Sequence, residues 1–354
     1  MDLHINPTGV CHEIFFDLHF FYSPVFNPFN SDSGKRAQSK ESYSGLVNIV
    51  GTAILLIITL LVVPVISYFT GTSLGLQELA ALKSLLWILL VAWISCFVLG
   101  ELTGNVSQVD KLWSLLPIAY AWTVTAHGNY SPRLLLMAIL VTAWGLRLTF
   151  NFSRHGGYRF SFWNGHEDYR WQVLRQKSEF QPRWKWTLFN LSFISGYQNI
   201  LIMLITLPTI VALQYAGTPL GWLDFSAAIL MSFMLLIETV ADQQQWRYQT
   251  AKKALLKAGQ PLTGEYAKGF LDTGLWAWSR HPNYFAEQGI WVAFYLFSIA
   301  ASGQWINWSI SGGILLLILF SGSSKFSEEI SAGKYPEYAH YQKTVPRFIP
   351  FKLF

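Results

Sequence analysis

Residues 222–242 read WLDFSAAILMSFMLLIETVAD. The part from 222 to 241 is apolar enough and long enough to cross the hydrocarbon core of a bilayer as a helix. A helix is the structure expected there, because a backbone in lipid has no water to bond and must pair its own polar groups. The run ends with Glu238 and Asp242, whose i, i+4 spacing places two carboxylates on one helix face. Like charges so placed repel each other unless a cation or a proton lies between them.

Other runs of the same character predict further membrane-spanning helices. With 222–241 they make eight candidates, at residues 46–69, 83–100, 112–127, 133–151, 187–214, 284–301 and 306–323. The expected fold class is therefore all-α, a polytopic membrane helix bundle of about seven or eight transmembrane helices. Residues 1–45 are expected to form a cytoplasmic leader that is partly disordered, and residues 46–354 a single integral membrane domain.

The composition agrees with a membrane protein. Of the 354 residues 52% are hydrophobic and only 13% are charged, with a mean hydropathy of +0.31, so a surface exposed to water throughout could not be built. These values exclude a disordered chain, a coiled coil and a disulfide scaffold. The 16 Trp and 16 Tyr suit a membrane interface, since both rings join an apolar body to a polar edge.

The positive charges are distributed unevenly between the two predicted sides. The eight spans place 22 of the 25 Lys and Arg residues on one side, which the positive-inside rule assigns to the cytoplasm. Both termini are therefore expected to be cytoplasmic, in the endoplasmic reticulum membrane if the source is eukaryotic. Long apolar runs beside these charges argue against nucleic acid as a partner, and no obligate protein partner is inferred. The basic loops would then face the compartment that contains soluble nucleotide cofactors. Alternatively, these loops only set the membrane topology and contact anionic lipid.

A set of polar residues lies inside or at the boundary of the predicted spans. Ionisable groups there cost roughly 2.5–3.5 kcal/mol on insertion scales, so each is expected to face a cavity or a partner. Arg147 is the candidate partner of Glu238 and Asp242, and a structural ion pair is the alternative to a functional one. The set consists of Asp110, Arg147, Asn151, Gln198, Asn199, Glu238, Asp242 and Glu287.

The last hundred residues hold the most specific motif, GLWAWSRHPNYFAE at 274–287. Pro282 suits the first turn of the apolar helix that follows, because its missing N–H would be unpaired there anyway. Asn283 and Glu287 then share one helix face, where an amide and a carboxylate can bind ribose hydroxyls or a carboxamide. An aromatic and basic tail follows at 335–351, and such a tail could instead lie on the bilayer surface.

These residues resemble a known family. RHPNY at 280–284 with Glu287, Tyr341 and the ending IPF at 349–351 is similar to the steroid 5-alpha-reductase C-terminal domain. The resemblance is closer to the uncharacterised DUF-type multi-pass membrane proteins grouped with that domain, and it covers residues 105–351. It rests further on the motifs DKLW at 110–113, WGLRLT at 144–149, EDYR at 167–170 and ADQ at 241–243.

The resemblance implies a membrane reductase. NADPH would bind in the cytoplasmic half of the bundle and deliver hydride to a carbon–carbon double bond conjugated to a carbonyl, in a lipophilic substrate. Within a cofactor-binding element at 270–351 and the helices before it, the implied cofactor-binding residues are Arg147, Asn151, Asp242, Arg280, His281, Asn283, Tyr284, Glu287, Glu328, Glu329 and Tyr341. The proton donor is expected to be Asp110, or Tyr120 on the same helix. Trp144 stands where the steroid enzymes carry tyrosine, which leaves the steroid itself open.

The sequence is also compatible with two other classes of protein, a methyltransferase and a non-enzymatic membrane protein. Isoprenylcysteine carboxyl methyltransferases, which bind S-adenosylmethionine, share the Arg-His-Pro-x-Tyr motif, and sterol reductases of the C14 type carry a related one. Asn283 with Glu287, and the upstream Asp110, Arg147 and Asp242, favour the reductase. The third class is a transporter or structural membrane protein. No metal site is expected, since no Cys/His spacing typical of zinc occurs, and no G-x-G-x-x-G follows a strand.

Overall fold

The structure, a computed structural model, describes residues 73–158, 167, 171, 175 and 180–350. The predicted leader 1–45 and the predicted span 46–69 lie outside these residues. All the regular structure in the described part is helical, which confirms the all-α prediction for that part. The α-helices are α3 Leu76–Thr103, α4 Gln108–Leu112, α5 Leu116–His127, α6 Pro132–Arg154, α8 Arg183–Phe189, α9 Gln198–Leu204, α10 Pro208–Gln214, α11 Trp222–Lys257, α12 Pro282–Ser302, α13 Ile310–Lys334 and α14 Tyr338–Thr344.

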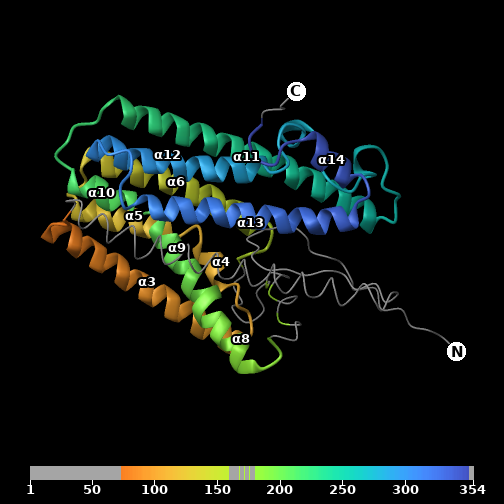
Figure 1. Ribbon diagram of the computed structural model, residues 1–354. Coiled ribbons are helices and arrows are strands. Elements are labelled where there is room, and N and C mark those ends of the chain that lie inside the picture. The colour runs from red at the N-terminus through yellow and green to blue at the C-terminus, as the bar shows by residue number, and fades with distance from the viewer. Residues whose placement is uncertain (1–72, 159–166, 168–170, 172–174, 176–179, 351–354) are drawn as a thin grey trace, which may run out of the picture.

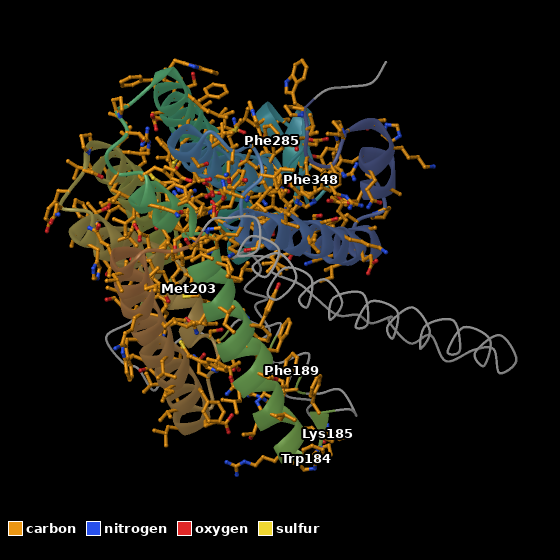
Figure 2. The ribbon with its side chains drawn as sticks, turned by 60° about the vertical axis from the view of Figure 1, so that its left-hand side comes forward. Trp184, Lys185, Phe189, Met203, Phe285 and Phe348 are labelled. Atoms are coloured by element: carbon orange, nitrogen blue, oxygen red, sulfur yellow. The ribbon has the colours of Figure 1, made fainter. Side chains whose placement is uncertain are left out.

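The helices form two groups. In the first, α11 and α12 pack along their length, with α6 and α13 beside them (Figure 1). In the second, α3 packs against the arm that runs through α8, the π-helix η3 Asn190–Tyr197 and α9 (Figure 1). Figure 2 shows Trp184 and Lys185 at the far end of that arm and Met203 where it meets the first group.

An aromatic stack stiffens the arm across its π-helix. Phe189 stacks on Phe193 with ring centroids 5.1 Å apart, and Phe193 on Tyr197 at 5.3 Å. Their i, i+4 spacing places the three rings on one face of the helix.

Five helical segments are long and apolar enough to cross a membrane: Leu76–Thr103, Pro132–Arg154, Arg183–Gln214, Trp222–Lys257 and Ile310–Lys334. The outer surface of α11 shows why this is a membrane protein. Ile229, Phe233 and Leu236 are 70%, 55% and 60% exposed, whereas the residues that the helix buries include Asp224 and Glu238. An apolar face turned outward and a polar face turned inward suit a lipid surround.

Two predicted spans, 112–127 and 284–301, are not among these five segments, although α12 is helical throughout the second. Residues 112–127 do not form a single helix: α4 ends at Leu112, a turn follows, and α5 begins at Leu116 with Pro117 in its first turn. Proline has no N–H to continue an earlier helix, so α5 starts afresh and is too short to cross a bilayer alone. The sequence predicted that Asp110 and Tyr120 share a helix. This prediction is wrong, because Asp110 lies on α4 and Tyr120 on α5.

Other helices extend past their predicted ends. The apolar run of α11 stops at Ala241, but the helix continues to Lys257 through QQQWRYQTAKKALLK, which is rich in helix formers. The prediction followed hydropathy, which reports where the apolar run ends and not where the helix ends.

Two buried ion pairs align α6 with α11. Arg133 donates to both oxygens of Asp224 at 2.7 and 2.9 Å, and Arg147 contacts Glu238 at 2.5 Å. The partners are fourteen residues apart on each helix, from 133 to 147 and from 224 to 238. At 1.5 Å per residue both spacings measure about 21 Å, so the helices run in the same direction in register.

The closest helix contact in the core depends on glycine. A Cβ added at Gly312 of α13 would overlap the backbone of Leu204 at the end of α9. At the neighbouring Gly313 nothing lies within 4 Å of the position that a Cβ would take. The two glycines therefore differ in their surroundings although they are adjacent in sequence.

We expect Gly312→Ala to destabilise the protein by about 1–3 kcal/mol, because backbone atoms cannot move aside for the new methyl group. Gly313→Ala is the matched control and is expected to stabilise by about 0.5–1 kcal/mol, since alanine is the better helix residue. Thermal unfolding of the two purified variants in detergent measures the difference. Equal effects would contradict the close packing of α13 on α9.

Candidate functional site

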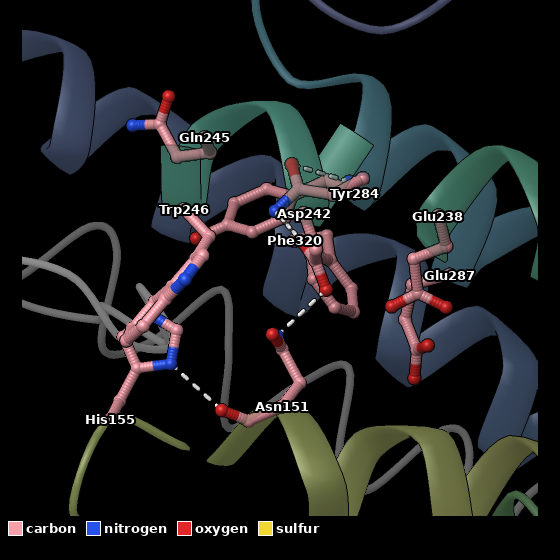
Figure 3. A pocket seen from close by; sticks show the side chains of 10 residues that line it. Asn151, His155, Glu238, Asp242, Gln245, Trp246, Tyr284, Glu287 and Phe320 are labelled. Atoms are coloured by element: carbon pink, nitrogen blue, oxygen red, sulfur yellow. Dashed lines mark hydrogen bonds between the residues drawn. The ribbon is translucent and has the colours of Figure 1, made fainter. Parts of the chain in front are cut away.

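A cavity lined by both polar and aromatic side chains lies where α6, α11, α12 and α13 meet (Figure 3). Its volume is about 60 Å³, room for roughly four to six water molecules. Aromatic rings from α11, α12 and α13 form part of the wall, and carboxyl and amide groups form the rest. The lining residues are Asn151, His155, Glu238, Asp242, Gln245, Trp246, Asn283, Tyr284, Glu287 and Phe320.

An ion network centred on Arg147 forms one side of this cavity. Arg147 donates through Nη1 to Asp242 Oδ2 at 2.7 Å and through Nη2 to Glu238 Oε1 at 2.5 Å. The three side chains are only 12%, 13% and 5% exposed, in that order. The predicted partnership of Arg147 with the two carboxylates is therefore confirmed. A guanidinium fork suits this task because it can bond two acceptors at once.

Two amides complete the coordination of Asp242. Asn151 of α6 donates to Asp242 Oδ2 at 2.8 Å, and Asn283 of α12 donates to Oδ1 at 3.2 Å. Asp242 is thus the group through which three helices meet at the cavity. The predicted proximity of Asn283 and Glu287 on one helix face is also confirmed, since both line the cavity.

Glu287 is held by two indoles. Trp144 of α6 donates to Glu287 Oε2 at 2.8 Å, and Trp291, one turn further along α12, donates to Oε1 at 3.0 Å. The two indole rings meet edge to face with centroids 5.0 Å apart. Glu287 is 2% exposed, so these N–H groups replace the water that its carboxylate would otherwise bind.

Two buried acceptors in the cavity wall have no donor within the described residues. These are Glu238 Oε2 and Gln245 Oε1. An unpaired buried acceptor costs about 1–3 kcal/mol, so such an atom points to a ligand, a water or a proton that supplies the donor.

Arg154 and His155 lie at the carboxyl end of α6, beside the cavity. Arg154 donates to Asn151 Oδ1 at 2.5 Å and to Gln243 Oε1 at 2.7 Å, and its guanidinium lies 4.8 Å from the centre of the Trp246 ring. His155 packs edge to face on the same indole with centroids 4.2 Å apart. Burial lowers the pKa of His155 from 6.5 to about 4, so its imidazole is neutral at pH 7.

The structure brings together about half of the predicted cofactor-binding residues. Those that meet at the cavity or its Arg147 network are Arg147, Asn151, Asp242, Asn283, Tyr284 and Glu287. Glu329 is exposed, whereas its neighbour Glu328 is buried. The rest of the predicted set, Arg280, His281, Glu328 and Tyr341, lies in a second cluster.

This second cluster, which we call the tail clamp, fixes the C-terminal segment to the bundle. Arg280 bonds both oxygens of Glu328, at 2.6 and 3.1 Å, and donates to the carbonyls of Gln342 and Val345. His281 Nε2 lies 3.0 Å from Glu328 Oε1. The backbone N–H groups of 280 and 281 donate to the carbonyls of 346 and 347, and the Tyr341 hydroxyl donates to the carbonyl of Trp276. Both polar side chains of the RHP motif, Arg280 and His281, are therefore engaged in this cluster.

The predicted proton donors lie elsewhere. Tyr120 is fully buried on α5, and its hydroxyl has no hydrogen-bond partner within the described residues. Asp110 lies near Lys111 and near Cys96, which bonds Asn199. Neither Asp110 nor Tyr120 is among the residues that line the cavity.

Five lining residues were not among the predicted site residues: His155, Glu238, Gln245, Trp246 and Phe320. Gln245 and Trp246 follow Glu238 and Asp242 at i+7 and i+4 on the same helix, so the helical period of α11 was a usable signal for them. His155 likewise follows Asn151 by one turn. Phe320 comes from α13, and no pattern in the sequence connects it with the others.

Comparison with known proteins gives a family without a stated activity. The family model described as "Protein of unknown function (DUF1295)" matches residues 96–345, which include the whole lining of the cavity. A protein of Schizosaccharomyces pombe named "Uncharacterized protein C594.04c" is 40% identical over 273 residues, which cover 72% of this chain and 77% of that protein. No solved structure matches the chain.

Arg147→Met should lower the free energy of unfolding by about 3–5 kcal/mol, because it leaves Glu238 and Asp242 buried without a cation. Adding Glu238→Gln and Asp242→Asn to that variant should restore part of the loss. Arg183→Met, at an exposed arginine, is the control and should change little. Thermal unfolding compares the variants; a single mutant as stable as the wild type would contradict the network.

His155 should make stability depend on pH. Its pKa is 6.5 in the unfolded chain and about 4 in the fold, so the unfolded state binds more protons in that interval. Stability from this residue is therefore complete above about pH 6.5 and is lost as the pH falls toward 4. The drop in melting temperature from pH 7 to pH 5 should be larger for the wild type than for His155→Gln. Equal falls would disprove the buried neutral imidazole.

Proposed function

The chain belongs to the DUF1295 family, and on that premise we propose that it is a membrane-embedded oxidoreductase. It binds NADPH at the cavity of Asp242 and reduces a carbon–carbon double bond conjugated to a carbonyl in a lipophilic substrate. The resemblance of the 280–287 motif to steroid 5-alpha-reductases supports this proposal, and a bundle of that family's type, with seven or eight spans, is part of it.

The observation that carries the proposal is the pattern of polar atoms in the cavity wall. The buried acceptor Gln245 Oε1 lacks a donor, Glu238 Oε2 lacks one whenever its carboxyl group is ionised, and the amides of Asn151 and Asn283, both bonded to Asp242, line the same cavity. A carboxamide and ribose hydroxyls present donors and acceptors together, as this wall requires. The aromatic rings of Trp246, Tyr284 and Phe320 supply flat apolar surface for a ring. The groups of this wall therefore suit the carboxamide end of a nicotinamide nucleoside.

The phosphates of the cofactor would be held outside the cavity. A volume of about 60 Å³ takes only one end of a dinucleotide. Arg154 and Lys253 both lie close enough to His155 to influence it electrostatically, so two cations are available beside the opening. Guanidinium and ammonium groups bind phosphate by charge-assisted hydrogen bonds.

The chemistry divides between cofactor and protein. A bound dihydronicotinamide supplies the hydride, and the chain supplies orientation and a polar surround at the point where charge develops. Arg147, Asn151 and Asn283 hold Asp242 in one position, and the two indoles hold Glu287 in another. A lipophilic substrate would reach the cavity from the bilayer that the exposed apolar faces of α6 and α11 contact.

The proposal includes an orientation. The carboxyl end of α6, with Arg154 and the cavity, would face the cytoplasm, where NADPH is available. Both termini would lie on that side, and the membrane would be that of the endoplasmic reticulum in a eukaryotic cell. The basic segments at 152–186 and 242–283 support this orientation through the positive-inside rule.

One observation favours a second candidate, a methyltransferase that uses S-adenosylmethionine. The cavity and its network contain Glu238, Asp242 and Glu287 but only one buried cation, Arg147. An excess of carboxylates stabilises a cationic ligand such as a sulfonium. The reductase remains the primary proposal, because the unpaired acceptors and the flanking cations match a dinucleotide with phosphates.

Thermal-shift binding separates the two candidates. NADPH should stabilise the purified protein by about 2.7 kcal/mol at a hundredfold excess over its dissociation constant, and S-adenosylmethionine should not. Asn283→Ala should abolish the shift, since it removes an amide from the cavity wall.

The control is Asn307→Ala, which removes a buried amide that bonds Ser298 far from the cavity lining. It should lower the melting temperature but keep the NADPH shift. A shift with S-adenosylmethionine alone would support the methyltransferase, and a shift with neither ligand would refute both.

A further inference from the structure

The cavity wall contains two carboxyl groups with unequal hydrogen bonding. Glu238 is 4% exposed; its Oε1 accepts from Arg147 at 2.5 Å, while its Oε2 has no donor within the described residues. Glu287 is 2% exposed and accepts one indole N–H at each oxygen. Glu287 is therefore stabilised as a carboxylate, and Glu238 is only half satisfied.

The two carboxyl groups lie next to each other. Figure 3 shows Glu238 and Glu287 side by side at one end of the cavity, and the two interact electrostatically. A bare acceptor beside a second acceptor, out of water, is unfavourable unless a hydrogen atom lies between them. Paired carboxyl groups in enzymes solve this problem by sharing one proton.

None of the charged groups described around the pair donates a hydrogen atom to Glu238 Oε2. From α6, Arg147 faces the pair, but it is divided between Glu238 and Asp242. From α11, Asp242 adds a negative charge whose oxygens are already bonded by Arg147 and the amides of Asn151 and Asn283. Beyond Asn151, His155 is neutral at pH 7. Among the described residues no group of three His, Cys, Asp or Glu side chains is arranged to hold a metal ion.

We propose that Glu238 carries a proton on Oε2, shared with Glu287, and that Glu238 is the proton donor of the reduction. This role rests on the proposed function. Reduction of an enone adds a hydride at the β-carbon, from the reduced cofactor, and a proton at the α-carbon. The O–H bond of Glu238 breaks as the new C–H bond forms, and the carboxylate then takes a proton from water. Glu238 lines the cavity, whereas Asp110 and Tyr120 do not.

Infrared difference spectroscopy tests the proton without a substrate. The full chain in detergent at pH 7 should show the C=O stretch of a protonated carboxyl group, shifted in D₂O. Glu238→Gln should remove this band, and the amide keeps the shape of the protonated acid, so the fold should survive. Glu287→Gln should remove it as well, because Glu238 then has no Glu287 carboxylate with which to share its proton. Asp224→Asn is the matched control and should keep the band, since both oxygens of Asp224 are bonded by Arg133.

Three results would overturn the proposal: no protonated carboxyl band in the wild type, a band that survives Glu238→Gln, or a band that NADPH at saturation removes. The last would mean that the proton leaves before a substrate could take it. Thermal-shift binding of NADPH to the same samples tests the proposed function separately. Absence of NADPH binding with the band present would leave the shared proton in place and refute its role in reduction.

Discussion

The structure depends on a guanidinium buried between two carboxyl groups in a protein whose outer faces are apolar. Arg147 cannot be left without partners away from water, so α6 must lie against the stretch of α11 that carries Glu238 and Asp242. The Arg133–Asp224 pair, about 21 Å away along both helices, fixes the same alignment at the other end. Asp242 then draws in Asn151 and Asn283, and the cavity forms around it.

Much of this arrangement could be predicted from the sequence. The i, i+4 spacing of Glu238 and Asp242 requires a cation, and Arg147 was the available one inside a span. The second pair was missed, although Arg133 and Arg147 have the same separation as Asp224 and Glu238. A search for equal spacings of opposite charges in two apolar runs would have found it and given the parallel register. Helix ends could not be predicted, because hydropathy falls at Ala241 while the helix continues.

The division of the RHPNY motif into two clusters could not be predicted either. Adjacent residues in a motif need not face the same site when a helix begins between them. Arg280 and His281 precede the first turn of α12 and reach Glu328 and the tail, whereas Asn283 and Glu287, within the helix, face the cavity. The tail clamp therefore acts on the site indirectly, by fixing the point at which α12 begins. Which part of a motif binds a ligand depends on helix phase, and that requires the fold.

The central claim is that this cavity receives one end of a reduced dinucleotide. The most direct measurement is a density map of the protein purified with NADPH. The account predicts density for a nucleoside among Asn283, Trp246 and Glu238, continuing past Arg154 to phosphate. Dinucleotide density elsewhere on the protein, with the cavity empty, would contradict it.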